Sequence, residues 1–170
     1  MGYYVKITNC EGMIKKDEKP YIFKQWCDLN KPENDNLKFG GSYSGGKKSE
    51  SWYSWMDSDY DKTCTCMEEI LGMLGFDFST DKDGNIFDLT YDSKTGQEAL
   101  FFEKAAPYIS QPLFISWVGE DDEKFSWIID DGNFFEGDEQ EYKILKEQKK
   151  LNQQVPSGEQ CQSQTQQFKL

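Results

Sequence analysis

Hydrophobic and polar residues alternate along several short stretches of the chain, a pattern typical of strands that bury one face. At the start, Tyr3, Val5 and Ile7 alternate with more polar neighbours and predict a first strand. Residues 76–80 and 85–91 flank an Asp-Gly pair, which predicts two strands joined by a tight turn. A hairpin explains this acidic turn better than a calcium-binding loop, whose ligand positions the residues do not match.

The same alternation returns in the second half of the chain. Residues 113–118, 124–129 and 134–136 predict a meander of three strands joined by two acidic turns. Trp117 and Trp127 lie on the first two of these strands, so we expect their rings to pair across the hairpin. Short turns between successive strands favour an antiparallel sheet.

Helical periodicity marks three further segments. Residues 20–29 carry an apolar stripe and begin with a proline, which suits the first turn of a helix. Thr65–Glu68 has the sequence of a capping box, and Gly75 supplies a stop after the apolar residues that follow. A second capping box, Thr95–Glu98, predicts a helix that Pro107 kinks or ends.

These elements predict an α+β fold: a mainly antiparallel sheet with helices packed on one face. We expect a single domain over residues 1–137, in which residues 31–51 form a flexible, glycine-rich loop. A charged helix follows over 138–151, because its acidic residues come first and its lysines last, as the helix dipole favours. Residues 152–170 are rich in glutamine, which predicts an extended tail that is disordered on its own.

Two residue types are missing from the 170 residues: the chain has no histidine and no arginine, so lysine supplies all 19 basic residues. Histidine is the commonest general acid or base and the commonest metal ligand near neutral pH. Arginine is the bidentate binder of phosphate and carboxylate. We therefore expect a protein that is not an enzyme, with carboxylate or cysteine chemistry as the alternative.

The formal net charge is −12. An acidic surface repels the phosphate backbone of nucleic acids and anionic lipid headgroups, so direct nucleic-acid binding is not expected. The same charge suits either plain solubility or attraction to a basic partner, and composition leaves both interpretations open.

The five cysteines are odd in number and irregular in spacing: Cys10, Cys27, Cys64, Cys66 and Cys161. This pattern favours free thiols in a reducing compartment. Only one pair is close in sequence, so a four-ligand zinc site would need remote ligands. We expect no metal and no cofactor.

Targeting signals are equally sparse. No apolar run approaches the roughly 20 residues of a membrane span. The first residues lack the apolar core of a secretion signal. A cytoplasmic protein without membrane insertion is the expectation.

Five residues are candidates for contact with a partner. Trp52 and Trp55 stand three apart in an aromatic run, and they either cover the core or form an exposed aromatic patch. Tyr142 and Leu145 are apolar residues of the charged helix, and Phe168 is an apolar residue of the tail. We expect the helix and tail to anchor the protein in an assembly.

Several stretches resemble a small family of bacteriophage and bacterial proteins. They are Met1–Val5, Tyr91–Glu98 with Ala106–Tyr108, Trp117–Glu123 with Asp131–Gly132, and more weakly Trp52–Asp57 and Leu71–Phe76. The family has no assigned activity, so the resemblance implies no functional residue. The segment from Asp138 onward departs from it. A glutamine-rich extension with lysine as the only base is similar to proteins of AT-rich eukaryotic genomes, such as those of ciliates.

Two functions fit these observations. The first is a non-catalytic interaction subunit or adaptor of a larger intracellular assembly, with a cytoskeletal or ciliary assembly as the more specific form. The second is an acidic inhibitor or immunity-type protein that masks a basic site on a partner. In both, the partners are other proteins.

Overall fold

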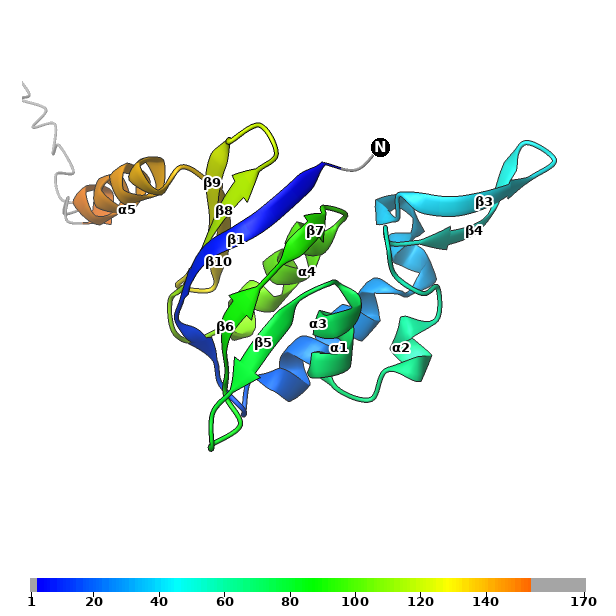
Figure 1. The fold of residues 1–170 in the computed structure, drawn as a ribbon, viewed down its shortest axis with the longest axis horizontal. Coiled ribbons are helices and arrows are strands. Elements are labelled where there is room, and N and C mark those ends of the chain that lie inside the picture. The colour runs from blue at the N-terminus through cyan, green and yellow to red at the C-terminus, as the bar shows by residue number, and fades with distance from the viewer. Residues whose placement is uncertain (1–2, 154–170) are drawn as a thin grey trace, which may run out of the picture. The chain divides into compact units, whose positions relative to one another are not determined.

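The computed structural model describes residues 3–153, shown as a ribbon in Figure 1. Residues 1–139 belong to one compact unit and residues 140–170 to a second, and each is described by itself. The first unit contains β1 (Tyr4–Glu11), β2 (Met13–Ile14), α1 (Lys19–Leu29), η1 (Pro32–Leu37), β3 (Gly40–Ser44), β4 (Lys47–Trp52), α2 (Tyr60–Thr63), α3 (Met67–Met73), β5 (Asp77–Thr80), β6 (Ile86–Thr90), β7 (Asp92–Lys94), α4 (Glu98–Ala105), η2 (Ala106–Tyr108), β8 (Leu113–Gly119), β9 (Lys124–Asp130) and β10 (Asn133–Gly137).

The fold is α+β, as the sequence predicts. A five-stranded sheet has the order β10-β9-β8-β1-β7, a three-stranded sheet has the order β2-β6-β5, and β3 and β4 form a separate hairpin. All pairs are antiparallel. Only Tyr91 separates β6 from β7, and its carbonyl accepts a hydrogen bond from Ile7 N at 2.9 Å. The chain therefore passes directly from one sheet to the other at this residue.

The predicted strands are confirmed. In β1, Val5 and Ile7 are buried while their neighbours are exposed, as the alternation requires. The meander forms β8, β9 and β10, and Trp117 and Trp127 are diagonal neighbours with ring centroids 4.6 Å apart. Asp81 opens the turn between β5 and β6, where its carboxylate accepts hydrogen bonds from two backbone N–H groups.

The core lies between one face of the main sheet and the helices α1, α3 and α4 (Figure 1). Aromatic rings fill much of it, because large rings bury more area per residue than aliphatic side chains. The fully buried rings are those of Trp26, Tyr53, Tyr60, Phe76, Phe101, Phe102 and Trp117. Most touch one another at centroid distances of 5–6 Å.

The helices form where the periodicity predicts, but the capping boxes do not. Cys66 and Gln97 are the N-cap residues of α3 and α4, and neither caps through its side chain. Glu69, rather than the predicted Glu68, accepts hydrogen bonds from the backbone and hydroxyl of Thr65. Gly75 ends α3 with a φ of +98°, as predicted.

The predicted loop over residues 31–51 is wrong. It contains the 3-10 helix η1 and the hairpin of β3 and β4. Gly45 and Gly46 have φ values of +59° and +75°, which a two-residue hairpin turn requires and which glycine adopts without strain. The Gly-Gly pair is a hairpin signal that the interpretation as a loop overlooked.

The predicted charged helix is α5 (Glu139–Gln153). None of its residues is buried, and Ile144, Leu145 and Leu151 are exposed. In the described part of the chain, no helix has both the length and the apolar character to cross a membrane. The predicted tail over 152–170 lies almost wholly outside the described residues.

The core predicts how stability depends on pH. Burial, helped by Asp35, raises the pKa of Tyr53 to about 12, and burial, helped by Asp61, raises the pKa of Cys27 to about 11. Both groups are neutral when protonated, so above their ordinary values of 10.0 and 9.0 the unfolded chain releases protons first. The stability that these two groups contribute is therefore fully present below about pH 9, and it is lost as the pH rises from about 9 to 12.

Without histidine, no side chain of ordinary pKa titrates between pH 6 and 8. Thermal unfolding followed by circular dichroism should give a constant midpoint across pH 6–8 and a lower one at pH 11. A midpoint that shifts by several degrees between pH 6 and 8 would contradict this prediction.

Candidate functional site

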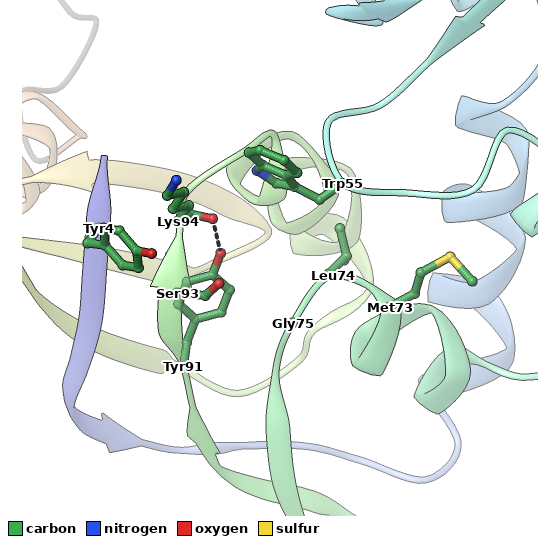
Figure 2. Close-up of a pocket in the computed structure, with 8 residues that line it drawn as sticks. All are labelled: Tyr4, Trp55, Met73, Leu74, Gly75, Tyr91, Ser93 and Lys94. Atoms are coloured by element: carbon green, nitrogen blue, oxygen red, sulfur yellow. Dashed lines mark hydrogen bonds between the residues drawn. The ribbon is translucent and has the colours of Figure 1, made fainter. Parts of the chain in front are cut away.

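A hollow of about 440 Å³ lies beside β7, and we call it the Trp55 hollow (Figure 2). It is lined by Tyr4, Trp55, Met73, Leu74, Gly75, Tyr91, Ser93 and Lys94. These residues come from β1, from the segment after β4, from the end of α3 and from β7 with the residue that precedes it. In the view of Figure 2, Tyr4 and Trp55 lie on opposite sides of Lys94, above the ring of Tyr91.

Tyr91 forms part of the base of the hollow. Its hydroxyl lies 2.7 Å from the carbonyl oxygen of Lys94, shown dashed in Figure 2, and 3.0 Å from Glu98 Oε1. Burial, and then the Glu98 carboxylate, raise the pKa of Tyr91, so the phenol stays protonated. Gly75 leaves room for this ring, because a Cβ there would lie 3.0 Å from Tyr91 Cε2.

Trp55 is held in an unusual backbone conformation. Its φ is +68°, in the left-handed region that favours glycine, and the side chain is 63% exposed. The indole lies against Gly96, where a Cβ would approach Trp55 Cδ1 to 2.7 Å, and its Nε1 is 3.4 Å from the carbonyl oxygen of Thr95. A large exposed side chain in a strained conformation is a feature that clusters at functional sites.

A buried amide fixes the segments around Trp55. Gln97 Oε1 accepts hydrogen bonds from the backbone N–H of Phe39 at 3.0 Å and of Ser54 at 3.3 Å, and its Nε2 donates to the carbonyl of Leu37 at 2.6 Å. Phe39 is 79% exposed. One side chain thus holds the backbone next to two exposed aromatic residues, Phe39 and Trp55.

The charge of the Trp55 hollow differs from that of the chain. Among the described residues that line it, Lys94 is the one cation and none is a carboxylate, although the net charge of the protein is −12. Lys94 Nζ lies 5.4 Å from the centroid of the Tyr4 ring, which is within the range of a cation–π contact. The hollow therefore combines aromatic surface with a single positive charge.

The structure separates the five predicted partner residues. Trp55 lines the hollow, whereas Trp52 is half-buried and packs over Gly40, where a Cβ would lie 2.3 Å from its indole. Tyr142 and Leu145 share a face of α5, being three residues apart. Phe168 lies outside the described residues.

Sequence reasoning missed Tyr4, Phe39 and Lys94. Tyr4 and Phe39 are aromatic residues exposed by 49% and 79%. A lone aromatic residue in a polar segment was the available signal for Phe39, and its position on the strand face opposite Val5 was the signal for Tyr4. Lys94 had no local signal, because its role depends on strands that meet only in the fold.

Three cysteine thiols outside the Trp55 hollow are poorly reactive. Burial raises the pKa of the thiols of Cys10, Cys27 and Cys64, so they are protonated at neutral pH and poor nucleophiles. Among residues 3–153, no group of three or more cysteine or acidic side chains is arranged to hold a metal ion. Cys161 lies outside the described residues.

No protein-family model, curated protein or solved structure gives a significant match to the chain. The resemblance to phage and bacterial proteins therefore stays a prediction.

The strain at Trp55 predicts an order of stability for two variants. Trp55→Gly and Trp55→Ala both remove the ring, but only glycine adopts the left-handed backbone freely. The glycine variant should be more stable by about 1 kcal/mol, after its greater entropy in the unfolded chain is counted. Urea unfolding measured by circular dichroism tests this order, and an alanine variant at least as stable as the glycine variant would contradict it.

Proposed function

We propose that this protein is a non-catalytic interaction subunit or adaptor that binds another protein through Trp55 and Tyr4, which line the Trp55 hollow, and through Phe39. The observation that carries the proposal is the pair of exposed aromatic residues, Trp55 and Phe39, next to backbone held by one buried amide, Gln97. Exposed, clustered aromatic surface on a soluble domain is typical of interaction sites.

Fixed backbone lowers the cost of binding. A partner gains contact area on large rings, while the segments that carry them lose little conformational entropy because they are already ordered. Tryptophan and tyrosine are also the residues most enriched in the few contacts that dominate interface energies. The strain at Trp55 is consistent with selection for binding rather than for stability.

The helix α5 is the second part of the proposed interaction. It has 15 residues, no buried side chain and three exposed aliphatic residues, Ile144, Leu145 and Leu151. Isolated helices of this length are marginal in water, so apolar contacts with another surface would stabilise it. Leu145 and Tyr142 are the residues that we assign to this contact.

Two acidic side chains, Asp28 and Asp81, are poor candidates for general acids. Hydrogen bonds from Lys24 and Lys31 lower the pKa of Asp28, and hydrogen bonds from Asn85 lower the pKa of Asp81. A carboxyl group that acts as a general acid needs the opposite change, a pKa raised toward neutral pH. Together with the protonated thiols, these groups favour a binding role, which we place in a cytoplasmic, cytoskeletal or ciliary assembly.

The Trp55 hollow also favours the adaptor over the acidic inhibitor. An inhibitor that masks a basic site needs carboxylates at its contact surface. The described residues that line this hollow include a lysine and no carboxylate. Contact through aromatic surface depends little on salt, whereas contact through many charges weakens steeply as salt rises.

Affinity purification from the native source tests the proposal. The full chain is compared with Trp55→Gly, with Leu145→Gln and with Tyr21→Ala, which removes an exposed ring of α1 away from the hollow lining. The same partner should be recovered with the full chain and with Tyr21→Ala, and lost with Trp55→Gly. Equal recovery with Trp55→Gly would refute the proposed surface, and equal recovery with Leu145→Gln would remove α5 from it.

A further inference from the structure

The strand β7 is an edge of the five-stranded sheet, and its outer side faces the Trp55 hollow. β7 pairs with β1 on one side and with no other strand among residues 3–153. β6 has β2 on one side and β5 on the other, and β7 continues β6 just as β2 continues β1 (Figure 1). The free side of β7 is therefore the side on which β5 lies, where Ser93, Lys94 and Gly75 line the hollow.

The backbone of β7 has unpaired groups on this free side. The Tyr91 carbonyl and the Thr95 N–H form hydrogen bonds toward β1, at 2.9 Å and 2.8 Å. Backbone groups of alternate residues point to opposite sides of a strand, so those of Asp92 and Lys94 point away from β1. The Lys94 carbonyl accepts from the Tyr91 hydroxyl, but neither the two N–H groups nor the Asp92 carbonyl has a partner among residues 3–153. An open row of this kind is a template for another strand.

The strand β5 would cover this edge if it began two residues earlier. Its first residue, Asp77, is opposite Thr90. The same register would place Gly75 opposite Asp92, two residues further along each strand. Gly75 instead has a φ of +98°, and its N–H donates to the carbonyl of Gly72 in α3 at 3.0 Å. The chain thus turns away from β7 here, and a strand from another molecule can continue the line of β5 along β7.

Lys94 selects the charge of such a strand. Its Nζ lies over the Tyr4 ring and forms no ion pair with a described residue. The acid two residues away, Asp92, is paired with Lys6 at 3.6 Å. In an antiparallel pair, the residue directly opposite Lys94 lies on the same face of the sheet, with Cβ atoms about 5 Å apart. An acidic side chain at that position can reach the Lys94 ammonium, whereas a basic one is repelled.

We propose that the partner binds through an extended segment that adds to the sheet at β7, antiparallel to it, with an acidic residue opposite Lys94. The N–H groups of Asp92 and Lys94 donate to carbonyl oxygens of the segment. Trp55 lies against Gly96, two residues beyond β7, at the end of the same edge. This inference rests on the proposed function and gives the chemistry of the partner: backbone bonds supply affinity in this mode, and side-chain contacts supply specificity.

Two end-blocked pentapeptides test the inference on the isotope-labelled full chain, followed by NMR. One is Thr-Val-Glu-Val-Thr, whose valines and threonines favour strands, and the other has Lys in place of Glu. We expect the Glu peptide to shift the amide signals of Asp92 and Lys94 with a Kd of about 1 mM, and to slow their hydrogen exchange, which is fast in the free chain. The Lys peptide should bind at least fivefold more weakly at about 0.15 M salt, where the net charge of the whole chain is screened.

Three variants assign the contacts. Asp92→Pro removes the outward N–H but no bond to β1, and proline is tolerated on edge strands in this orientation. Asp92→Ala is its matched control, because both variants lose the carboxylate and only the proline variant loses the N–H. The Glu peptide should bind Asp92→Pro about fivefold more weakly than Asp92→Ala. Lys94→Gln keeps the N–H and removes the charge, so the two peptides should bind it within about twofold of each other.

These results are distinct from the test of the proposed function. No shift of the β7 amides up to about 10 mM Glu peptide, or equal affinity of the full chain for both peptides, would overturn the inference. The proposed function would then still stand if Trp55→Gly loses the partner. Full recovery of the partner with Trp55→Gly would instead refute the proposed function, a result that peptide binding cannot produce. Urea unfolding checks the fold of Asp92→Pro, and if that variant is unfolded, the comparison of the two peptides on Lys94→Gln decides.

Discussion

Trp26→Ala should lower the free energy of unfolding by about 4 kcal/mol, a large part of the 5–15 kcal/mol that is usual for a domain. Trp26 is 0% exposed in the middle of α1, and its ring lies among those of Phe101 and Phe102. Its Nε1 donates to the carbonyl of Phe101 at 2.7 Å. The substitution therefore leaves a large cavity and removes a buried side-chain hydrogen bond.

Two controls separate these effects. Trp26→Phe fills most of the space but still removes the donor, so its cost should be about half as large. Tyr21→Ala changes an exposed residue of the same helix whose ring stacks on Tyr108, and it should cost about 1 kcal/mol or less. Urea unfolding measures all three, and a loss below about 1 kcal/mol for Trp26→Ala would show that the aromatic core is not arranged around this residue.

The sequence predicts α1 and the meander well because their signals are local. The proline at the start of α1 and the spacing of Ile22, Trp26 and Leu29 identify a helix and its buried face before any partner is known. The alternation of Leu113, Ile115 and Trp117 does the same for β8. In each case the residues that define the pattern are those that pack into the core.

The candidate sites were harder to predict because they depend on contacts between distant segments. Gln97 bonds to residues 58 and 60 positions away, and nothing in its own neighbourhood indicates this role. The two possible roles of the tryptophan pair are divided between its members: Trp52 is half-buried over Gly40, and Trp55 is exposed. A positive φ at a tryptophan has no sequence signal at all.

Trp55→Gly is the second variant with a large expected effect, here on binding. Exposed tryptophans at the centre of an interface commonly contribute 2 kcal/mol or more, which corresponds to a change in Kd of about thirtyfold to a hundredfold. Glycine relieves the strained backbone, which limits the cost to stability, and urea unfolding of the same variant separates a loss of binding from a loss of stability. Tyr21→Ala serves as the matched control, since it removes an exposed ring elsewhere.

Salt dependence adds a second readout for the same partner. The adaptor proposal predicts that the Kd changes less than about tenfold between 50 and 500 mM salt, because aromatic burial carries the contact. An acidic inhibitor would lose affinity much more steeply over this range.

The most direct test is therefore the Kd of the purified partner for the full chain and for Trp55→Gly, measured by calorimetry at both salt concentrations. We predict that the glycine variant binds at least thirtyfold more weakly at either concentration, while it unfolds at a urea concentration close to that of the full chain. An unchanged Kd for Trp55→Gly would contradict the claim that this exposed aromatic surface is what the protein uses to bind.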